Sequence, residues 1–318
     1  MRRIGWVIVL AVLCVWTTDV ASQQPPLFGG LGEKLPWAFP PRVEKPFPED
    51  PAPQSLPGSS RKYTQAQVDN LLNPPDWFPD RHPAPPEVVV KGRGGALACG
   101  ACHLMSGLGH PESSDLTGLT APYIVQQMLD FKSGARREPA RMNAIATDVS
   151  DADAQLAAEY FAALPRRTFV RVVEAAMVPR TFLGNGRMRF VEPGGAMEPI
   201  GNRIIMVPDD QARARLRDPY SGFLAYVPPG SVARGKDLVE TGGGRTVGCA
   251  ICHGLDLKGQ ASIPRLAGMH PIYTVRQLYW FKDGTRKGVD AALMQLPVVR
   301  LTDDDIVAIS AYLASLAP

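Results

Sequence analysis

Four of the five cysteines in this chain lie in two copies of one short pattern, CGACH at 99–103 and CAICH at 249–253. Two thiols at positions i and i+3 lie on one face of a helical turn, so both can form thioethers with the vinyl groups of a single porphyrin. The histidine that follows can place its imidazole on the iron. Cys-x-x-Cys-His is the attachment pattern of c-type haem. The sequence therefore predicts two covalently bound haem c groups, one held by Cys99, Cys102 and His103 and the other by Cys249, Cys252 and His253.

Other uses of paired cysteines fit less well. In an exported protein four cysteines commonly form two disulfides, but a histidine directly after each pair argues against that interpretation. A zinc site needs four ligands at suitable spacing. A redox thiol pair would explain one motif but not its repetition.

The N-terminus has the pattern of a secretory signal peptide over residues 1–22. Arg2 and Arg3 precede an apolar run at 4–16, which is short for a membrane span, and Val20 and Ser22 fit cleavage before Gln23. An uncleaved anchor is the alternative. Cleavage there would remove Cys14. The signal-peptide pattern therefore predicts a mature chain that is periplasmic and has no integral membrane span. The formal charge of +3, from 34 basic and 31 acidic residues, gives no reason to expect nucleic acid as a partner.

The two motifs belong to a longer repeat, which indicates a duplicated domain. Up to residue 136 the matching positions are 150 residues apart; they are Leu116 and Leu266, Gly118 and Gly268, Tyr123 and Tyr273, Gln127 and Gln277, Phe131 and Phe281, Lys132 and Lys282, Gly134 and Gly284, and Arg136 and Arg286. Beyond that point the spacing becomes 152, as Asp151 and Asp303, Asp153 and Asp305, and Tyr160 and Tyr312 show.

The repeat also selects a sixth ligand for each iron. Met142 and Met294 keep the spacing of 152, and a thioether opposite histidine raises the reduction potential of a haem. Met128 matches Leu278 inside an apolar stripe and is interpreted as a core residue. The remaining histidines, His82, His110 and His270, match no other histidine and are expected to be solvated or locally hydrogen-bonded.

Local patterns predict small helical domains. Helices are expected at 121–132, 150–164, 233–243 and 302–316, the second and fourth with Ser or Thr caps. Alternating segments at 168–175, 186–192 and 202–208 predict short strands of a hairpin or meander. The predicted fold is mainly all-α, with a Pro-rich extended arm at 23–62, tandem haem domains at 63–165 and 230–318, and a partly β insert at 166–229. A short helix is expected at 63–72.

These residues resemble the class I c-type cytochromes, specifically the tandem dihaem group of two fused mono-haem domains. The resemblance rests on both haem motifs, on Leu-x-Gly-x₄-Tyr-x₃-Gln ahead of Phe-Lys-x-Gly-x-Arg, and on the downstream methionines; it covers about 88–165 and 230–318. It implies a helical wrap around each haem. It also implies that a proline carbonyl orients the proximal histidine, a role that fits Pro264, whereas Ser114 at the matching position puts the contact to His103 in doubt.

The predicted function is single-electron transfer between periplasmic redox partners, on the dehydrogenase or the terminal oxidase side, and the chain is expected not to be an enzyme. Two irons with all ligands supplied by protein leave no site for substrate, so the cofactor carries only electrons. The alternative is a dihaem peroxidase or other haem oxidoreductase with one open iron. A thiosulfate dehydrogenase would need a further cysteine ligand, and none remains after cleavage. Two roles are possible for the insert: a structured spacer between the haem domains, or a docking surface for a partner enzyme. Lys132, Lys282, Arg136 and Arg286, with Tyr123 and Tyr273, are candidates for contacts to haem propionates.

Overall fold

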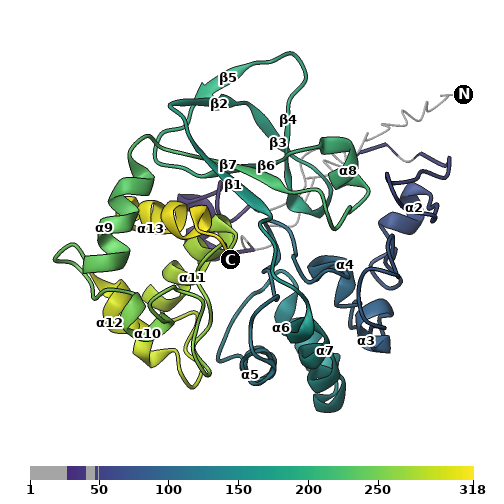
Figure 1. The fold of residues 1–318 in the computed structure, drawn as a ribbon, viewed down its shortest axis with the longest axis horizontal. Helices are drawn as coiled ribbons and strands as arrows, with labels where there is room; N and C mark the ends of the chain where they lie inside the picture. The colour runs from purple at the N-terminus through teal and green to yellow at the C-terminus, as the bar shows by residue number, and fades with distance from the viewer. Residues whose placement is uncertain (1–26, 41–46, 49) are drawn as a thin grey trace, which may run out of the picture.

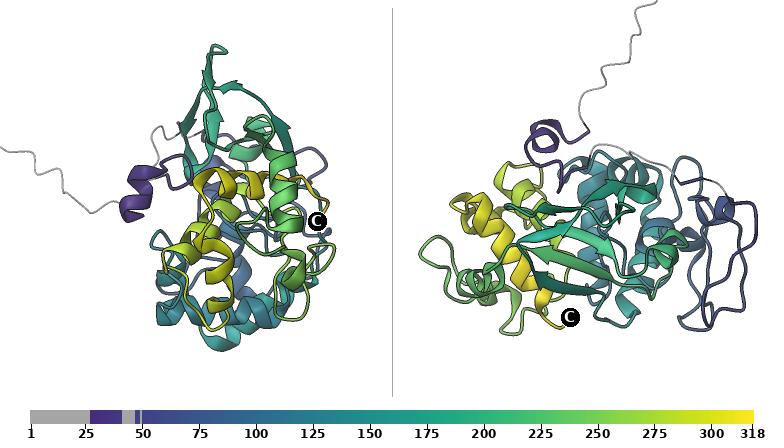
Figure 2. Two further views of the ribbon diagram at one scale, coloured as in Figure 1. Left: turned by 90° about the vertical axis from the view of Figure 1, so that its left-hand side faces the viewer. Right: turned by 90° about the horizontal axis from the view of Figure 1, so that it is seen from above.

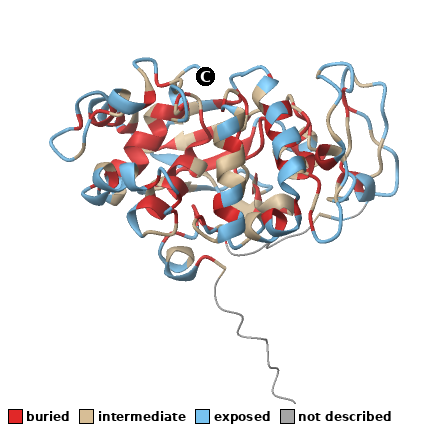
Figure 3. Cartoon of the chain, turned by 90° about the horizontal axis from the view of Figure 1, so that it is seen from below, coloured by how far each residue is buried: buried red, intermediate tan, exposed pale blue. Residues whose placement is uncertain are grey.

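The computed structural model describes residues 27–40, 47–48 and 50–318 (Figure 1). The predicted signal peptide lies outside these residues. Figure 1 shows two helical units side by side, with the strands of the insert above them. Figure 3 shows that buried residues run along the inward faces of both units, while exposed residues occupy the outer turns. Among the described residues no helix is long and apolar enough to cross a membrane.

The first unit contains α3 (Glu87–Val90), α4 (Gly100–His103), α5 (Ala121–Ser133), α6 (Met142–Asp148) and α7 (Asp151–Ala163). Side-chain caps fix two of its helix starts: the hydroxyls of Thr120 and Ser150 accept hydrogen bonds from the backbone N–H groups three residues further on. Helix α5 packs against α6 and α7, and Ile124 of α5, Ile145 of α6 and Phe161 of α7 belong to one buried cluster. The helices predicted at 121–132 and 150–164 are confirmed.

The second unit contains α9 (Ser231–Thr241), α10 (Ala250–His253), α11 (Pro271–Lys282), α12 (Ala292–Val299) and α13 (Asp303–Ser315). A full capping box between Thr302 and Asp305 begins α13. The change of spacing to 152 has a structural counterpart. Lys132 Nζ donates to the carbonyl of Val149, and Lys282 Nζ donates to that of Leu301, so each lysine ties its helix to the loop before the closing helix.

The insert forms three small sheets. Strand β7 (Phe223–Val227) lies between β1 (Val170–Glu174) and β6 (Ile205–Pro208), parallel to β1 and antiparallel to β6. Two further pairs are β2 (Met177–Pro179) with β5 (Met197–Pro199) and β3 (Thr181–Leu183) with β4 (Arg189–Val191). The short elements η1 (Asn185–Arg187) and α8 (Gln211–Arg215) complete it.

The prediction of a hairpin or meander is confirmed in part: all three predicted segments contain strands and β3 with β4 forms a hairpin, but β1 pairs with β7 in parallel. A parallel pair needs a crossover connection. Its second strand, β7, lies outside the predicted segments, although its apolar and aromatic run between Gly222 and Pro228 is a strand pattern. The insert is also no separate body. Phe169 and Phe223 share one buried cluster with Ile306 and Ile309 of α13.

The prediction of an extended arm at 23–62 is wrong for residues 27–39. These residues form α1 (Gly29–Lys34), coloured purple on the outside of the molecule in Figure 2, and then a buried turn. Trp37 and Phe39 join the core of the second unit, and the Ala38 carbonyl accepts a hydrogen bond from Arg276 at 2.5 Å. Apolar residues among the prolines account for this packing, since burying them outweighs the ordering of a short segment.

Residues further along this N-terminal segment pack over the first unit. Helix α2 (Gln65–Val68), with a capping box at Thr64, confirms the short helix expected at 63–72. Trp77 Nε1 donates to the carbonyl of Leu216 at 2.7 Å, and Trp77 and Phe78 form a small core with Leu216. The N-terminal segment thus meets the end of the insert.

Candidate haem sites

Each motif forms a single helical turn. The backbone N–H of His103 donates to the carbonyl of Cys99, and that of His253 to the carbonyl of Cys249, both at 3.0 Å. The cysteines are unpaired, so none is consumed by a disulfide. Burial raises the pKa of Cys99 to about 12 and that of Cys249 to about 11. Each turn therefore presents two neutral thiols, and the imidazole of the histidine follows directly after the second thiol.

Both motif histidines have one ring nitrogen committed to the protein. Nδ1 of His103 lies 2.9 Å from the carbonyl oxygen of Ser114, and Nδ1 of His253 lies 2.7 Å from that of Pro264. A carbonyl only accepts, so Nδ1 carries the proton and Nε2 keeps its lone pair for a metal. Burial lowers the pKa of both imidazoles, which favours this neutral form.

The doubt about Ser114 is resolved. The contact uses the backbone carbonyl, which serine supplies as well as proline does. Proline at this position restricts the backbone but contributes no atom to the hydrogen bond.

The first motif opens onto a cavity of about 520 Å³. Cys99, Cys102, His103 and Met142 all line it, together with apolar side chains such as Phe161. The structure thus brings Met142, the first residue of α6, to the same cavity as the motif histidine. Met128 lines this cavity too, so its interpretation as a purely core residue is incomplete.

The second motif is more open at its surface. His253 is buried, whereas Cys252 and its neighbour Ile251 are exposed. Met294 lies in α12, partly buried against the core of the second unit.

The two units meet at a pair of matched arginines. Arg136 and Arg286 form an isolated antiparallel bridge, and each guanidinium bonds to Gln127 and Gln277 at 2.8–2.9 Å. The hydroxyl of Tyr123 lies 2.8 Å from Arg286 Nη2, and that of Tyr273 lies 3.3 Å from Arg136 Nη2. The matched positions of the two copies therefore contact one another across the junction.

This junction reaches the first cavity, which Arg136, Gln127 and Tyr273 help to line. Both arginines are buried and bonded to neutral side chains, and Nε of Arg136 has no hydrogen-bond partner among the described residues. Burial and the neighbouring Arg286 lower the pKa of Arg136. Two adjacent buried cations suit a cofactor that carries carboxylates, as haem does. The thiols, the free Nε2, the apolar walls and these cations fit that group.

The other histidines are hydrogen-bonded within the protein: His82 and His110 locally, as expected, whereas the expectation is wrong for His270, which is buried and bonds to a residue far away in the chain. His82 bonds to Asp76 at 3.1 Å and to the carbonyl of Pro83. His270 lies 2.8 Å from the carbonyl of Leu108 and packs against Phe169. His110 also lines the first cavity, but its ring is engaged by Ser113 at 3.3 Å.

Comparison with known proteins agrees with this geometry. The sequence profile of the cytochrome c family matches residues 232–317. Cytochrome c-554(548) of Halomonas halodenitrificans is 39% identical over 87 residues, which cover 27% of this chain and 96% of that protein. The chain belongs to the c-type cytochromes.

Longer matches extend over both units of this cytochrome. Cytochrome c4 of Pseudomonas aeruginosa is 27% identical over 232 residues, covering 72% of this chain and 88% of the relative. A thiosulfate dehydrogenase electron acceptor of Stutzerimonas stutzeri is 27% identical over 224 residues, covering 70% and 80%. The protein is a class I cytochrome of the tandem dihaem group that carries two covalently bound haem c. It is an electron carrier rather than an enzyme.

The cytochrome's own residues have three roles in this activity. The haems supply the one-electron redox chemistry. The carbonyls of Ser114 and Pro264 hold the proton on Nδ1 and orient each imidazole. Apolar side chains form much of the wall of the first cavity, and the junction arginine Arg136 supplies fixed positive charge to its lining.

Proposed function

We propose that this cytochrome is a periplasmic carrier in which both irons have His/Met ligation. Cys99, Cys102 and His103 hold the first haem, with Met142 as its sixth ligand. Cys249, Cys252 and His253 hold the second, with Met294. The observation that carries the proposal is the convergence of Cys99, Cys102, His103 and Met142 on one cavity. The equal spacing of Met142 and Met294 from the repeated helices supports the second site.

Within this proposal, residues 63–165 and 230–318 are the two haem domains. The insert at 166–229 joins them, and residues 1–22 direct export. Because both irons are closed, electrons enter and leave without a bound substrate. The matched arginines and tyrosines at the junction hold the two sites in one orientation.

Removal of each methionine tests the ligands. In the reduced holoprotein, Met142→Ala and Met294→Ala are each expected to let carbon monoxide bind to one haem, while the parent binds little. Met128→Leu is the matched control, because Met128 lines the first cavity and its counterpart is already leucine. Ready binding of carbon monoxide by the parent at one haem would instead favour the peroxidase-type alternative. Binding by the Met128 variant alone would move the ligand to that position.

We further propose that the electron donor is a dehydrogenase, because relatives from Stutzerimonas stutzeri and Thiomonas intermedia are thiosulfate dehydrogenase electron acceptors. The test mixes the oxidised cytochrome with thiosulfate and a purified thiosulfate dehydrogenase and follows haem reduction by absorbance. Fast reduction that needs the dehydrogenase supports this donor. Reduction no faster than with thiosulfate alone excludes it.

A further inference from the structure

The insert contributes directly to the first haem site. Gly186, Arg187 and Arg217 belong to the insert, yet all three line the first cavity. Arg187 and Arg217 both have positive φ, 58° and 54°, a conformation that residues other than glycine rarely adopt. Such backbone conformations persist only where the surrounding structure requires them. Since both arginines line the same cavity, the surrounding structure holds them there as part of the site.

These arginines place positive charge at the cysteine edge of the cavity. Arg187 and Arg217 line the first cavity together with Cys102 of the motif. Arg217 Nη1 donates to the carbonyl of Ala101 at 2.5 Å, inside the motif itself. Nη1 of Arg187 is buried without a hydrogen-bond partner in the part of the chain that the structure describes.

The carboxylates that line the cavity are already engaged. Glu112 pairs with Arg276 at 2.6 Å, and Glu138 accepts hydrogen bonds from the backbone N–H groups of Arg141 and Met142. Arg217 Nη2 also lies 3.8 Å from Oδ1 of Asp69, so the charge of Arg217 is partly balanced. The charge of Arg187, whose Nη1 has no such partner among the described residues, is available to whatever occupies the cavity.

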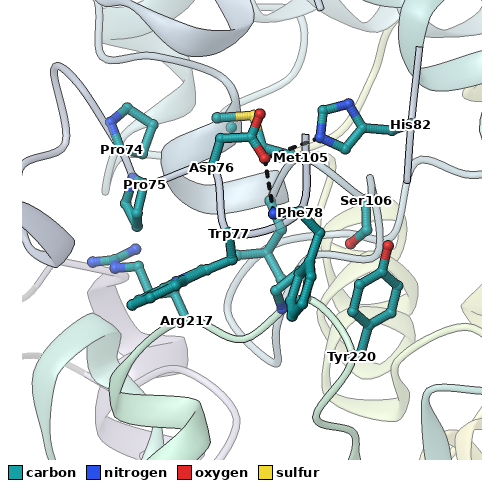
Figure 4. A pocket seen from close by; sticks show the side chains of 13 residues that line it. Pro74, Pro75, Asp76, Trp77, Phe78, His82, Met105, Ser106, Arg217 and Tyr220 are labelled. Carbon is teal, nitrogen blue, oxygen red and sulfur yellow. Dashed lines mark hydrogen bonds and ion pairs between the residues drawn. The ribbon is translucent and has the colours of Figure 1, made fainter. Parts of the chain in front are cut away.

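The matching edge of the second site has no such cover. Ala101 is completely buried, whereas its counterpart Ile251 is 72% exposed. Met105 is 4% exposed, whereas Leu255, 150 residues on, is 97% exposed. Figure 4 shows what covers the first motif: Trp77 and Phe78 of the N-terminal segment and Arg217 and Tyr220 from the end of the insert surround a small pocket that Met105 also lines.

We infer that the insert closes the cysteine edge of the first haem site with Arg187 and Arg217, and that their charge gives the first haem a higher reduction potential than the second. The inference rests on a haem in each site. Reduction removes one positive charge from a haem iron, so nearby cations and exclusion of water both favour the reduced form at the first site. The second site, exposed to water and without these cations, holds its electron less tightly.

The test is a spectroelectrochemical titration of the dihaem holoprotein. Arg187→Met keeps the side-chain length and removes the charge. It is expected to lower only the higher-potential wave, so that the equilibrium constant for electron exchange between the haems falls roughly tenfold, the order expected for one charge at an effective dielectric constant near 20. Arg187→Lys retains the charge and should stay close to the parent. Arg171→Met is the matched control, since Arg171 lies on the outer face of the same insert and pairs with Asp209.

A reciprocal variant identifies which haem gives which wave. Ile251→Arg adds a cation at the open edge of the second site and should raise the lower-potential wave alone. If Arg187→Met does not fold, as judged by circular dichroism, Arg217→Met provides the same test from the second arginine. The inference is overturned if both charge-removing variants leave the two waves unchanged or lower the wave that Ile251→Arg raises. Haem content, measured as the pyridine haemochrome, separates these outcomes from failure of the haem assignment, because fewer than two haems per chain would contradict the assignment itself.

Discussion

Replacement of Arg265 should show that the two units depend on one buried ion pair. Arg265 and Asp115 occupy the same position in the two sequence copies, and their side chains are 0% and 2% exposed. The guanidinium pairs with the Asp115 carboxylate and donates to the carbonyls of Thr117 and Ala267, each at 2.7 Å. Asp115 also accepts from the N–H and hydroxyl of Thr117 at 2.8 Å.

Arg265→Leu leaves the Asp115 carboxylate buried without its cation. Removing one partner of a buried pair costs about 3–5 kcal/mol, because the remaining charge stays out of water without compensation. We expect a loss of that size in the free energy of unfolding, measured by guanidinium titration of the oxidised holoprotein with far-UV circular dichroism. Arg171→Leu removes an exposed pair on the insert and should change the free energy of unfolding by less than about 1 kcal/mol.

The internal symmetry allows a sharper test by exchanging the charges. The two carbonyls that accept from Arg265 belong to Thr117 and Ala267, which are themselves matching positions. An arginine at position 115 therefore meets the same pair of acceptors. We expect the double variant Asp115→Arg/Arg265→Asp to recover most of the lost stability, short by about 1 kcal/mol for the missing Thr117 hydroxyl bond. A double variant no more stable than Arg265→Leu, or a single variant within about 1 kcal/mol of the parent, would refute the reasoning.

Two further predictions concern the second unit. In Gly235→Ala, the added Cβ would lie 2.0 Å from the Ala308 carbonyl oxygen, where α9 crosses α13. We expect the free energy of unfolding, measured by heat or denaturant, to fall by about 1–3 kcal/mol or more. Gly30→Ala, with open space around the added Cβ, should have no such cost, and equal effects of the two variants would contradict this account. Burial tends to raise the pKa of Asp305, but hydrogen bonds from Thr302 and the guanidinium of Arg234 hold it below its usual range. The stabilisation from this carboxylate is thus complete above the unfolded-state pKa and disappears as pH falls through the lower folded-state pKa. Asp305→Asn should therefore destabilise the protein by roughly 1.5–3 kcal/mol near pH 7 and progressively less at acid pH; a difference that does not depend on pH would count against it.

The haem chemistry was largely readable from the chain because it is local. Cys99, Cys102 and His103 lie within one helical turn, so their spacing alone brings thiols and imidazole together. The starts of two helices could be predicted because Ser150 and Thr302 cap backbone N–H groups only three residues further along the chain. The repeat, which needs only an offset to be recognised, led from Met142 to Met294.

Contacts between residues far apart in the chain could be seen only in the tertiary structure. The parallel pairing of β1 with β7, the burial of Phe39 in the second unit and the arrival of Arg187 at the first cavity all depend on contacts across many tens of residues. No local pattern encodes such contacts, because a side chain's partner there is fixed by the packing of whole elements. The sequence determined that two haem sites of the same kind exist. The tertiary structure made them unequal, since the insert and the N-terminal segment cover the haem motif of the first copy and leave that of the second exposed.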